Sequence, residues 1–193
     1  MHTNGLSSAV KKLKWWQVAV IAVVVSLLGK LAGGNDTEQQ KLYTQKLKQA
    51  PGAPPAWLFG PAWTFNNFFL LMGLQRLLQR DDLPEKRRLL ILQAMIWIIF
   101  FSFNYVYFRK KSTVLAGIWT VSDAVLATAS IITAHKLDRK VAASYLPLTI
   151  WTIFASYLAA YQALTNDDEA LHLPALLKPR FCIRKTVSDL MAV

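Results

Sequence analysis

Charged residues are scarce in this chain, and cysteine and histidine are almost absent. Only 17% of its 193 residues are charged and 54% are apolar, against roughly 25% and 45–50% in an average soluble domain. This composition excludes a disordered chain and a nucleic-acid-binding arm. The single cysteine, Cys182, excludes an intramolecular disulfide and a thiolate metal cage. The three histidines, His2, His135 and His172, are too scattered for a metal-ligand spacing, so we predict no metal site.

The sequence also lacks an internal repeat and a clear signal-peptide cleavage site. Without a repeat, an inverted-repeat transporter is disfavoured. The first apolar run follows a cluster of lysines, as it does in a signal peptide, yet no small-x-small cleavage site precedes Lys30. We therefore expect a retained first helix rather than a cleaved signal.

What the chain does contain is a series of long apolar runs, which together take more than half of its length. A membrane-spanning helix needs about 20 mostly apolar residues. The stretches that meet or nearly meet this length are 15–33, 57–78, 89–108, 114–134 and 141–164. The links after the second run are short, so the sequence predicts an all-α, integral membrane bundle of five transmembrane helices. Residues 1–14 would form a polar lead, 15–164 the membrane domain and 165–193 a polar tail.

The net charge of +11 comes from basic residues near the ends of these runs. Examples are 11–14, 86–88, 109–111 and 136–140. This placement matches anionic headgroups at a bilayer surface, not a continuous stripe along a phosphate backbone. The lipid bilayer is therefore an expected partner and nucleic acid is not. Lys and Arg are nearly balanced between the two sides, so the orientation stays open.

The longest internal connection, residues 35–56, begins polar and ends with Pro51, Pro54 and Pro55. A loop of this length is usually functional or disordered. Proline restricts the chain to extended conformations and reduces the entropy lost on ordering. We predict that residues 50–56 cover the mouth of a cavity and become less mobile when ligand binds. The alternative is a stiff connector that never touches ligand.

Polar and aromatic side chains inside the last four runs recur at helical spacing, so each set shares one helix face. The sets are Trp63, Asn66, Asn67 and Leu70; Trp97, Asn104 and Tyr107; Trp119, Asp123, Leu126 and Ser130; and Trp151, Ala155, Leu158 and Gln162. Polar groups within a span normally face the bundle interior. Converging faces would line a cavity with flat aromatic walls, which suits a large, flat, mostly apolar ligand.

Plainer interpretations exist for the same residues. Trp15, Trp16 and Trp57 are placed as interfacial anchors. The asparagines could be interhelical hydrogen-bond partners, and Asp123 either a structural hydrogen-bond centre or a ligand or proton group. The small residues Ala155, Ala159 and Ala163 suggest close helix packing.

The start of the second run carries a specific motif, PPAWLFGPAW at residues 54–63. Its Pro-Pro-x-Trp-x-Phe-Gly-Pro-x-Trp pattern resembles the signature of the TspO/MBR family. That family includes the bacterial tryptophan-rich sensory proteins and the mitochondrial translocator protein, or peripheral benzodiazepine receptor. The resemblance extends over residues 15–164 through Asn104, Trp119, Asp123, Pro147, Trp151 and Ala155.

The resemblance implies a five-helix bundle whose cavity binds porphyrins, haem, sterols and synthetic ligands. With the helical faces, it gives the candidate ligand-binding residues Phe59, Gly60, Trp63, Asn66, Asn104, Tyr107, Trp119, Asp123, Leu126, Trp151, Ala155 and Leu158. Porphyrin or haem is expected as ligand rather than as a required cofactor. The sterol motif of animal members is missing, since acidic residues follow Tyr161 and no Lys or Arg lies between Tyr161 and Lys178. Sterol therefore ranks below porphyrin.

Three classes of function remain open from the sequence. The first is a membrane receptor or transport-like protein for tetrapyrroles, in a bacterial cell membrane rather than the mitochondrial outer membrane. The second is a light-dependent porphyrin-degrading enzyme using Trp63 and Trp151, although the sequence offers no nucleophile or general-base pair. The third is a scaffold that acts through helix-mediated dimerisation. A homodimer is expected from the face of Ala155 and Ala159 together with the dimers that the resemblance implies.

Overall fold

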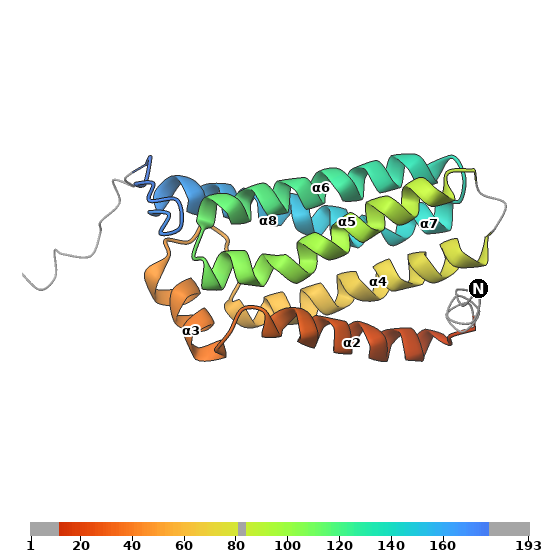
Figure 1. The fold of residues 1–193 in the computed structure, drawn as a ribbon, viewed down its shortest axis with the longest axis horizontal. Coiled ribbons are helices and arrows are strands. Elements are labelled where there is room, and N and C mark those ends of the chain that lie inside the picture. Colours follow the sequence, from red (N-terminus) through yellow and green to blue (C-terminus); the bar gives the residue numbers. More distant parts are fainter. Residues whose placement is uncertain (1–11, 81–83, 178–193) are drawn as a thin grey trace, which may run out of the picture.

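The computed structural model describes residues 12–80 and 84–177, which fold almost entirely into helices (Figure 1). The long helices are α2 (Trp15–Leu31), α4 (Phe59–Gln79), α5 (Lys86–Asn104), α6 (Thr113–His135) and α8 (Leu146–Thr165). Short helical segments join them: α3 (Asp36–Lys41), η1 (Leu42–Lys46), η2 (Ala56–Leu58), η3 (Tyr105–Arg109) and α7 (Arg139–Ser144). The prediction of an all-helical chain is confirmed for the described residues.

Three of these helical stretches are long and apolar enough to cross a membrane, namely α5 with η3, α6, and α7 with α8. A fourth span is possible if α2 and the α3–η1 segment, which meet at a bend of 77°, count as one. Helix α4 does not qualify because Asn66, Asn67, Gln75 and Arg76 interrupt its apolar sequence. The structure thus supports a membrane protein with three or four candidate spans, and the predicted number of five is not confirmed.

One predicted run is interrupted at a single residue. Residues 141–164 were expected as one span, and residues 139–165 form one, although α7 ends at Ser144 and α8 begins at Leu146. Pro147 explains the break, because proline has no backbone N–H and its ring clashes with the carbonyl group four residues earlier. The interruption is short, and α7 continues the line of α8 along the bundle to the end opposite α3 (Figure 1).

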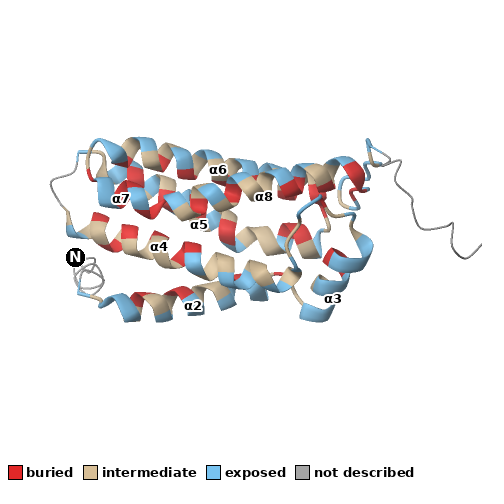
Figure 2. Cartoon of the chain, turned by 180° about the vertical axis from the view of Figure 1, so that it is seen from behind, coloured by how far each residue is buried: buried red, intermediate tan, exposed pale blue. Residues whose placement is uncertain are grey.

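The long helices pack side by side, α6 along α8, α5 along α6, and α2 along α4. The main apolar core lies in the half of the bundle next to α7. Its buried residues are Leu70, Leu77, Leu89, Ile96, Ala127, Ala134, Val141, Ala142, Tyr145 and Leu148. Buried positions run along the inner faces of the helices, while the outer faces are exposed (Figure 2). Side chains fill this half of the bundle, and the cavity lies in the other half, next to α3.

A buried polar triangle joins three helical elements within this core. Gln93 of α5 donates from Nε2 to the carbonyl oxygen of Leu70 on α4 at 2.8 Å. Its Oε1 accepts from the Tyr145 hydroxyl, at the α7–α8 junction, at 3.0 Å. Because both ends of the amide have partners, Gln93 can be buried at 1% exposure without an unsatisfied group.

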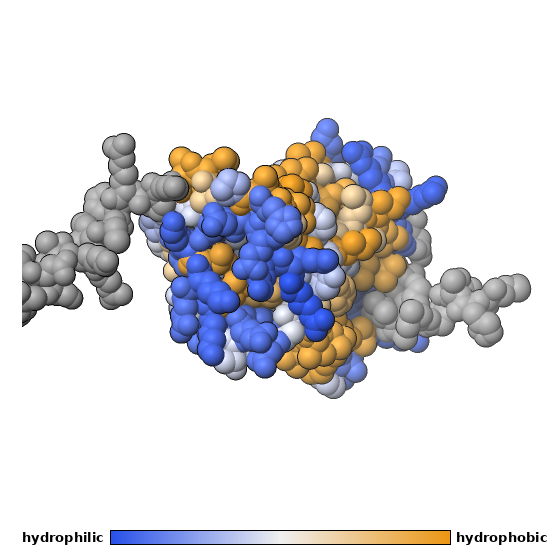
Figure 3. All heavy atoms as spheres, turned by 60° about the vertical axis from the view of Figure 1, so that its left-hand side comes forward, coloured by the Kyte–Doolittle hydropathy of each residue, from blue (hydrophilic) through white to orange (hydrophobic). Residues whose placement is uncertain are grey.

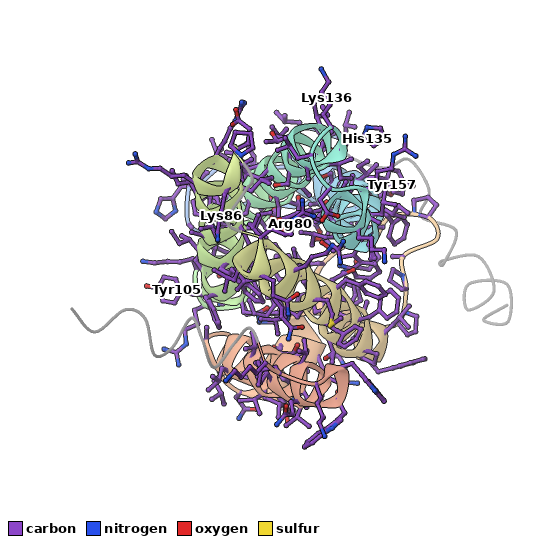
Figure 4. The ribbon with its side chains drawn as sticks, turned by 90° about the vertical axis from the view of Figure 1, so that its right-hand side faces the viewer. Arg80, Lys86, Tyr105, His135, Lys136 and Tyr157 are labelled. Atoms are coloured by element: carbon purple, nitrogen blue, oxygen red, sulfur yellow. The ribbon has the colours of Figure 1, made fainter. Side chains whose placement is uncertain are left out.

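Asp138 ties α4 to the corner between α6 and α7. Both its carboxylate oxygens accept from Arg76 Nε, at 3.0 and 2.9 Å, and Arg80 Nη1 lies 3.1 Å from Oδ2. Oδ1 also accepts from the backbone N–H groups of Lys140 and Val141, which caps α7. Figure 4 shows Arg80 directed toward the middle of this end of the bundle, while Lys136 points outward. Burial alone would raise the pKa of Asp138, but the hydrogen bonds from Arg76, Val141 and Lys140 outweigh it and lower the pKa.

We expect Asp138→Asn to destabilise the folded protein by about 1–3 kcal/mol, because it removes the charge that Arg76 and Arg80 face. A lowered folded-state pKa gives stability that is present above the unfolded value of about 4 and is lost as the pH falls through the folded value. Thermal unfolding in detergent should therefore show wild type losing stability in acid and Asp138→Asn losing less. Glu38→Gln, at an exposed position of α3, is the control. Equal melting of wild type and Asp138→Asn at neutral pH would contradict the assignment.

Candidate functional site

A cavity of about 940 Å³ occupies the half of the bundle next to α3. Its walls come from α2, the first half of α4, the end of α5, and parts of α6 and α8. The aromatic residues that line it are Tyr43, Trp57, Phe59, Trp63, Phe65, Phe68, Phe100, Phe103, Tyr107 and Phe108. Its volume lies at the upper end of the roughly 300–1,000 Å³ typical of small-molecule sites.

The rings of the wall pack against one another, which fixes their orientation. Phe59 lies edge-on to Tyr43 and to Trp151, at centroid distances of 5.3 and 5.7 Å. Trp63 contacts Phe100 at 5.3 Å, and Phe103 stacks on Tyr107 at 5.6 Å with an interplanar angle of 16°. These are favourable geometries for aromatic pairs. The cavity is therefore bounded by flat side chains that are already held in place.

Polar side chains at the cavity wall are few and mostly have partners in the protein. Asn104 Nδ2 donates to the carbonyl oxygen of Gly29 at 2.9 Å, which joins α5 to α2. The Tyr107 hydroxyl donates to Gln162 Oε1 on α8 at 2.8 Å. Since these groups already have partners, the cavity presents mainly apolar surface to a ligand.

The segment from α3 to η2, residues 36–58, closes this end of the cavity, and we call it the cover. Figure 3, in which this end comes forward, shows hydrophilic side chains gathered over it beside apolar surface. Asp36, Gln39, Gln40 and Tyr43 line the cavity from the first part of the cover. Within the predicted lid, residues 50–56, only Ala56 does so. The cavity is thus closed mainly by α3 and η1, upstream of the predicted segment, and the predicted change in mobility stays a prediction.

Hydrogen bonds attach the middle of the cover to the end of α8. Asn166 holds the backbone of Lys48 at both polar groups, accepting from its N–H at 2.7 Å and donating to its carbonyl oxygen at 3.1 Å. Gln162 Nε2 donates to Gln49 Oε1 at 2.7 Å. The Tyr157 hydroxyl donates to the carbonyl oxygen of Pro51 at 3.2 Å. The cover therefore depends on the C-terminal half of α8 and on Asn166, which follows it, for its position.

Seven of the predicted site residues line the cavity. They are Phe59, Gly60, Trp63, Asn104, Tyr107, Ala155 and Leu158. The other five, Asn66, Trp119, Asp123, Leu126 and Trp151, do not. Of the two tryptophans considered for redox chemistry, Trp63 lines the cavity and Trp151 does not.

The five remaining residues have other surroundings. Asn66 and Trp151 line a separate, shallower groove of about 450 Å³ between α4 and α8. Trp119 Nε1 donates to Ser102 Oγ at 2.8 Å, and Leu126 packs against the main core. Asp123 is 1% exposed and lies one turn deeper on α6 than Thr120, which does line the cavity.

The sequence reasoning missed the wall contributed by α2 and the charged end of the cover. Residues of α2 face the cavity at spacings of three and four. They are the small or apolar Ala19, Ala22, Val23, Ser26 and Leu27, and the charged Lys30. That spacing is itself the signal of one helix face. It was hidden because α2 is apolar all round and carries no aromatic residue between Trp16 and its end.

The small residues expected to promote dimerisation lie inside the bundle. Ala155 and Ala159 line the cavity, and Ala159 is only 7% exposed. A Cβ atom at Gly117 of α6 would lie 3.9 Å from the carbonyl oxygen of Ala159, so α6 approaches this face of α8 closely. This face therefore serves packing between α6 and α8, and the homodimer remains a prediction without an assigned surface.

Comparison with known proteins adds a family match. The model of the TspO/MBR family matches residues 18–164 of the chain. A search of curated proteins finds no match.

We expect Asn166→Ala to loosen the cover, because it removes both hydrogen bonds to the Lys48 backbone. Trypsin should then cleave after Lys46 and Lys48 about fivefold faster, as the loss of about 1 kcal/mol implies. Asp167→Asn is the matched control, since Asp167 accepts from Ala175 and not from the cover. Unchanged cleavage in Asn166→Ala would show that α8 does not hold the cover.

Proposed function

The chain belongs to the TspO/MBR family, and on that premise we propose that it is a membrane protein that binds porphyrins or haem within its helix bundle. The observation that carries the proposal is the cavity of about 940 Å³ with aromatic rings on several sides. A flat macrocycle can stack on such rings, and burial of its apolar surface supplies most of the binding free energy. The cover would separate the bound macrocycle from water.

We also propose that five helices cross the bilayer, with α2 and α4 completing the set. The asparagines that lower the hydropathy of α4 are buried, Asn66 at 3% and Asn67 at 0% exposure, and Asn67 Nδ2 donates to Ser26 Oγ on α2 at 2.9 Å. They therefore do not face lipid. The other long helices expose large apolar side chains, among them Val24, Ile98, Val125 and Ile153, and α4 exposes Phe65, which also lines the cavity. Such a belt is what a bilayer requires.

Porphyrin fits the cavity better than sterol does on two grounds. Ten aromatic residues line the walls, against three branched aliphatic ones, Val23, Leu27 and Leu158, and flat rings match a macrocycle better than a puckered ring system. The basic residue of the animal sterol motif has no counterpart between Tyr161 and Lys178. Sterol is therefore the second ligand to test, in the same assay.

Protoporphyrin added to the purified protein should quench tryptophan fluorescence in a saturable manner, because Trp57 and Trp63 line the cavity. Gly60 offers a matched pair of variants, since nothing lies within 4 Å of a Cβ atom built there. Gly60→Ala should bind within about twofold of wild type, whereas Gly60→Trp should fill the cavity and weaken binding by at least about tenfold, or 1.4 kcal/mol. Absence of saturable quenching in wild type, or equal affinity in Gly60→Trp, would refute the proposed site.

Ligand should also slow hydrogen exchange in the cover. Contacts between a bound macrocycle and Tyr43, Ala56 or Trp57 would oppose the opening that exchange requires. We expect the amides of residues 47–56 to gain protection at saturating protoporphyrin, while those of α7, at the far end of the bundle, do not change. Identical protection of the cover with and without bound ligand would leave it as a stiff connector.

A further inference from the structure

The cavity has one charged corner. Among the described residues that line it, only Lys30 and Asp36 carry a charge. Lys30 lies in the last turn of α2, and Asp36 begins α3, where the cover starts. Their side chains form an ion pair with Lys30 Nζ 2.6 Å from Asp36 Oδ2.

This ion pair is easily exchanged. The two side chains are 54% and 66% exposed, so water and salt screen their attraction. Asp36 also lies in the first turn of α3, where the N-terminal end of a helix favours a negative charge. Asp36 therefore does not depend on Lys30, and another carboxylate can take its place at low cost.

Lys30 is also placed to hold the polar edge of a ligand whose body lies deeper. The residues of α2 below it, Ser26 and Val23, share its face and line the cavity. From the mouth inward, the wall carries first the Lys30 ammonium group and then the rings of Trp63 and Phe100. A molecule with one acidic edge and an apolar, flat body matches that sequence of surfaces.

We propose that Lys30 binds a carboxylate of an acidic, flat ligand at the mouth of the cavity. When no such ligand is present, Asp36 forms the ion pair with Lys30 instead. The inference rests on the proposed function. It adds that Lys30 makes the protein prefer an acidic ligand to the ester of the same ligand. Exchange of Asp36 for the ligand carboxylate also removes the side-chain link between α2 and the start of the cover.

The test compares protoporphyrin with its dimethyl ester, which has the same ring and no negative charge. Both are titrated by tryptophan quenching into the full chain in nanodiscs of zwitterionic lipid. Partitioning of each probe into lipid is the same for every variant. A change between variants in the ratio of the ester dissociation constant to the acid dissociation constant therefore reports a change in binding to the protein. We expect this ratio to fall about three- to tenfold in Lys30→Gln and to be kept in Lys30→Arg, because the lost contact is charge-assisted.

Two further variants test whether Asp36 competes with the ligand carboxylate for Lys30 and whether the loss of any positive charge has the same effect. Asp36→Asn should raise the ratio about twofold or more, because it removes the carboxylate that competes for Lys30. Lys46→Gln makes the same charge change at an exposed position of the cover that does not line the cavity, and should leave the ratio unchanged.

The outcomes distinguish this inference from the proposed function. If both probes bind saturably and Lys30→Gln leaves their ratio unchanged, the inference is wrong and the porphyrin site stands. If Asp36→Asn lowers the ratio as Lys30→Gln does, Asp36 supports binding and the competition is refuted. If neither probe binds saturably to wild type, the proposed function itself fails.

Discussion

Within a bilayer, the pairing of buried polar side chains determines which face of each helix turns inward. No water is present at that depth to satisfy a lone amide or hydroxyl group, so a partner in the bundle stabilises it. Among the described residues, the Asp123 carboxyl group and Asn66 Nδ2 are buried without one. Asn67 reaches Ser26, Asn104 reaches the backbone of Gly29, and Gln93 bridges Leu70 and Tyr145. These bonds connect α4 to α2, α5 to α2, and α5 to both α4 and the α7–α8 junction. The apolar packing around them follows from the faces that they select.

The two halves of the bundle use this constraint differently. Next to α7, aliphatic side chains such as Leu70, Leu77 and Leu89 fill the space between helices completely enough to be buried at 0–1% exposure. Along the cavity, the inward positions of α2 and α8 include the small residues Ala19, Ala22, Ala155 and Ala159, which do not fill the space between the helices. Rings such as Trp63 and Phe100 pack against each other at the side instead of crossing the middle. A cavity results from small residues on two helices facing large, mutually supported rings on two others.

The sequence predicted the helices well because run length and hydropathy depend on local composition alone. It predicted which residues share a helix face but not how deep the cavity extends along that face. Asp123 and Trp151 illustrate the difference, since each lies one turn from a lining residue, Thr120 or Ala155, and yet falls beyond the cavity. The position of the cover could not be predicted either. It depends on contacts across more than 100 residues of sequence, such as that between Lys48 and Asn166.

The cover is attached to the cavity wall at its start and in its middle through residues that line the cavity. At its start, Asp36 pairs with Lys30, and both line the cavity. In its middle, Gln49 bonds to Gln162, whose other amide atom accepts from the Tyr107 hydroxyl. Gln162 and Tyr107 also line the cavity. The Gln162 amide uses one side for the wall and the other for the cover. The wall and the cover are therefore joined through the two hydrogen bonds of a single side chain.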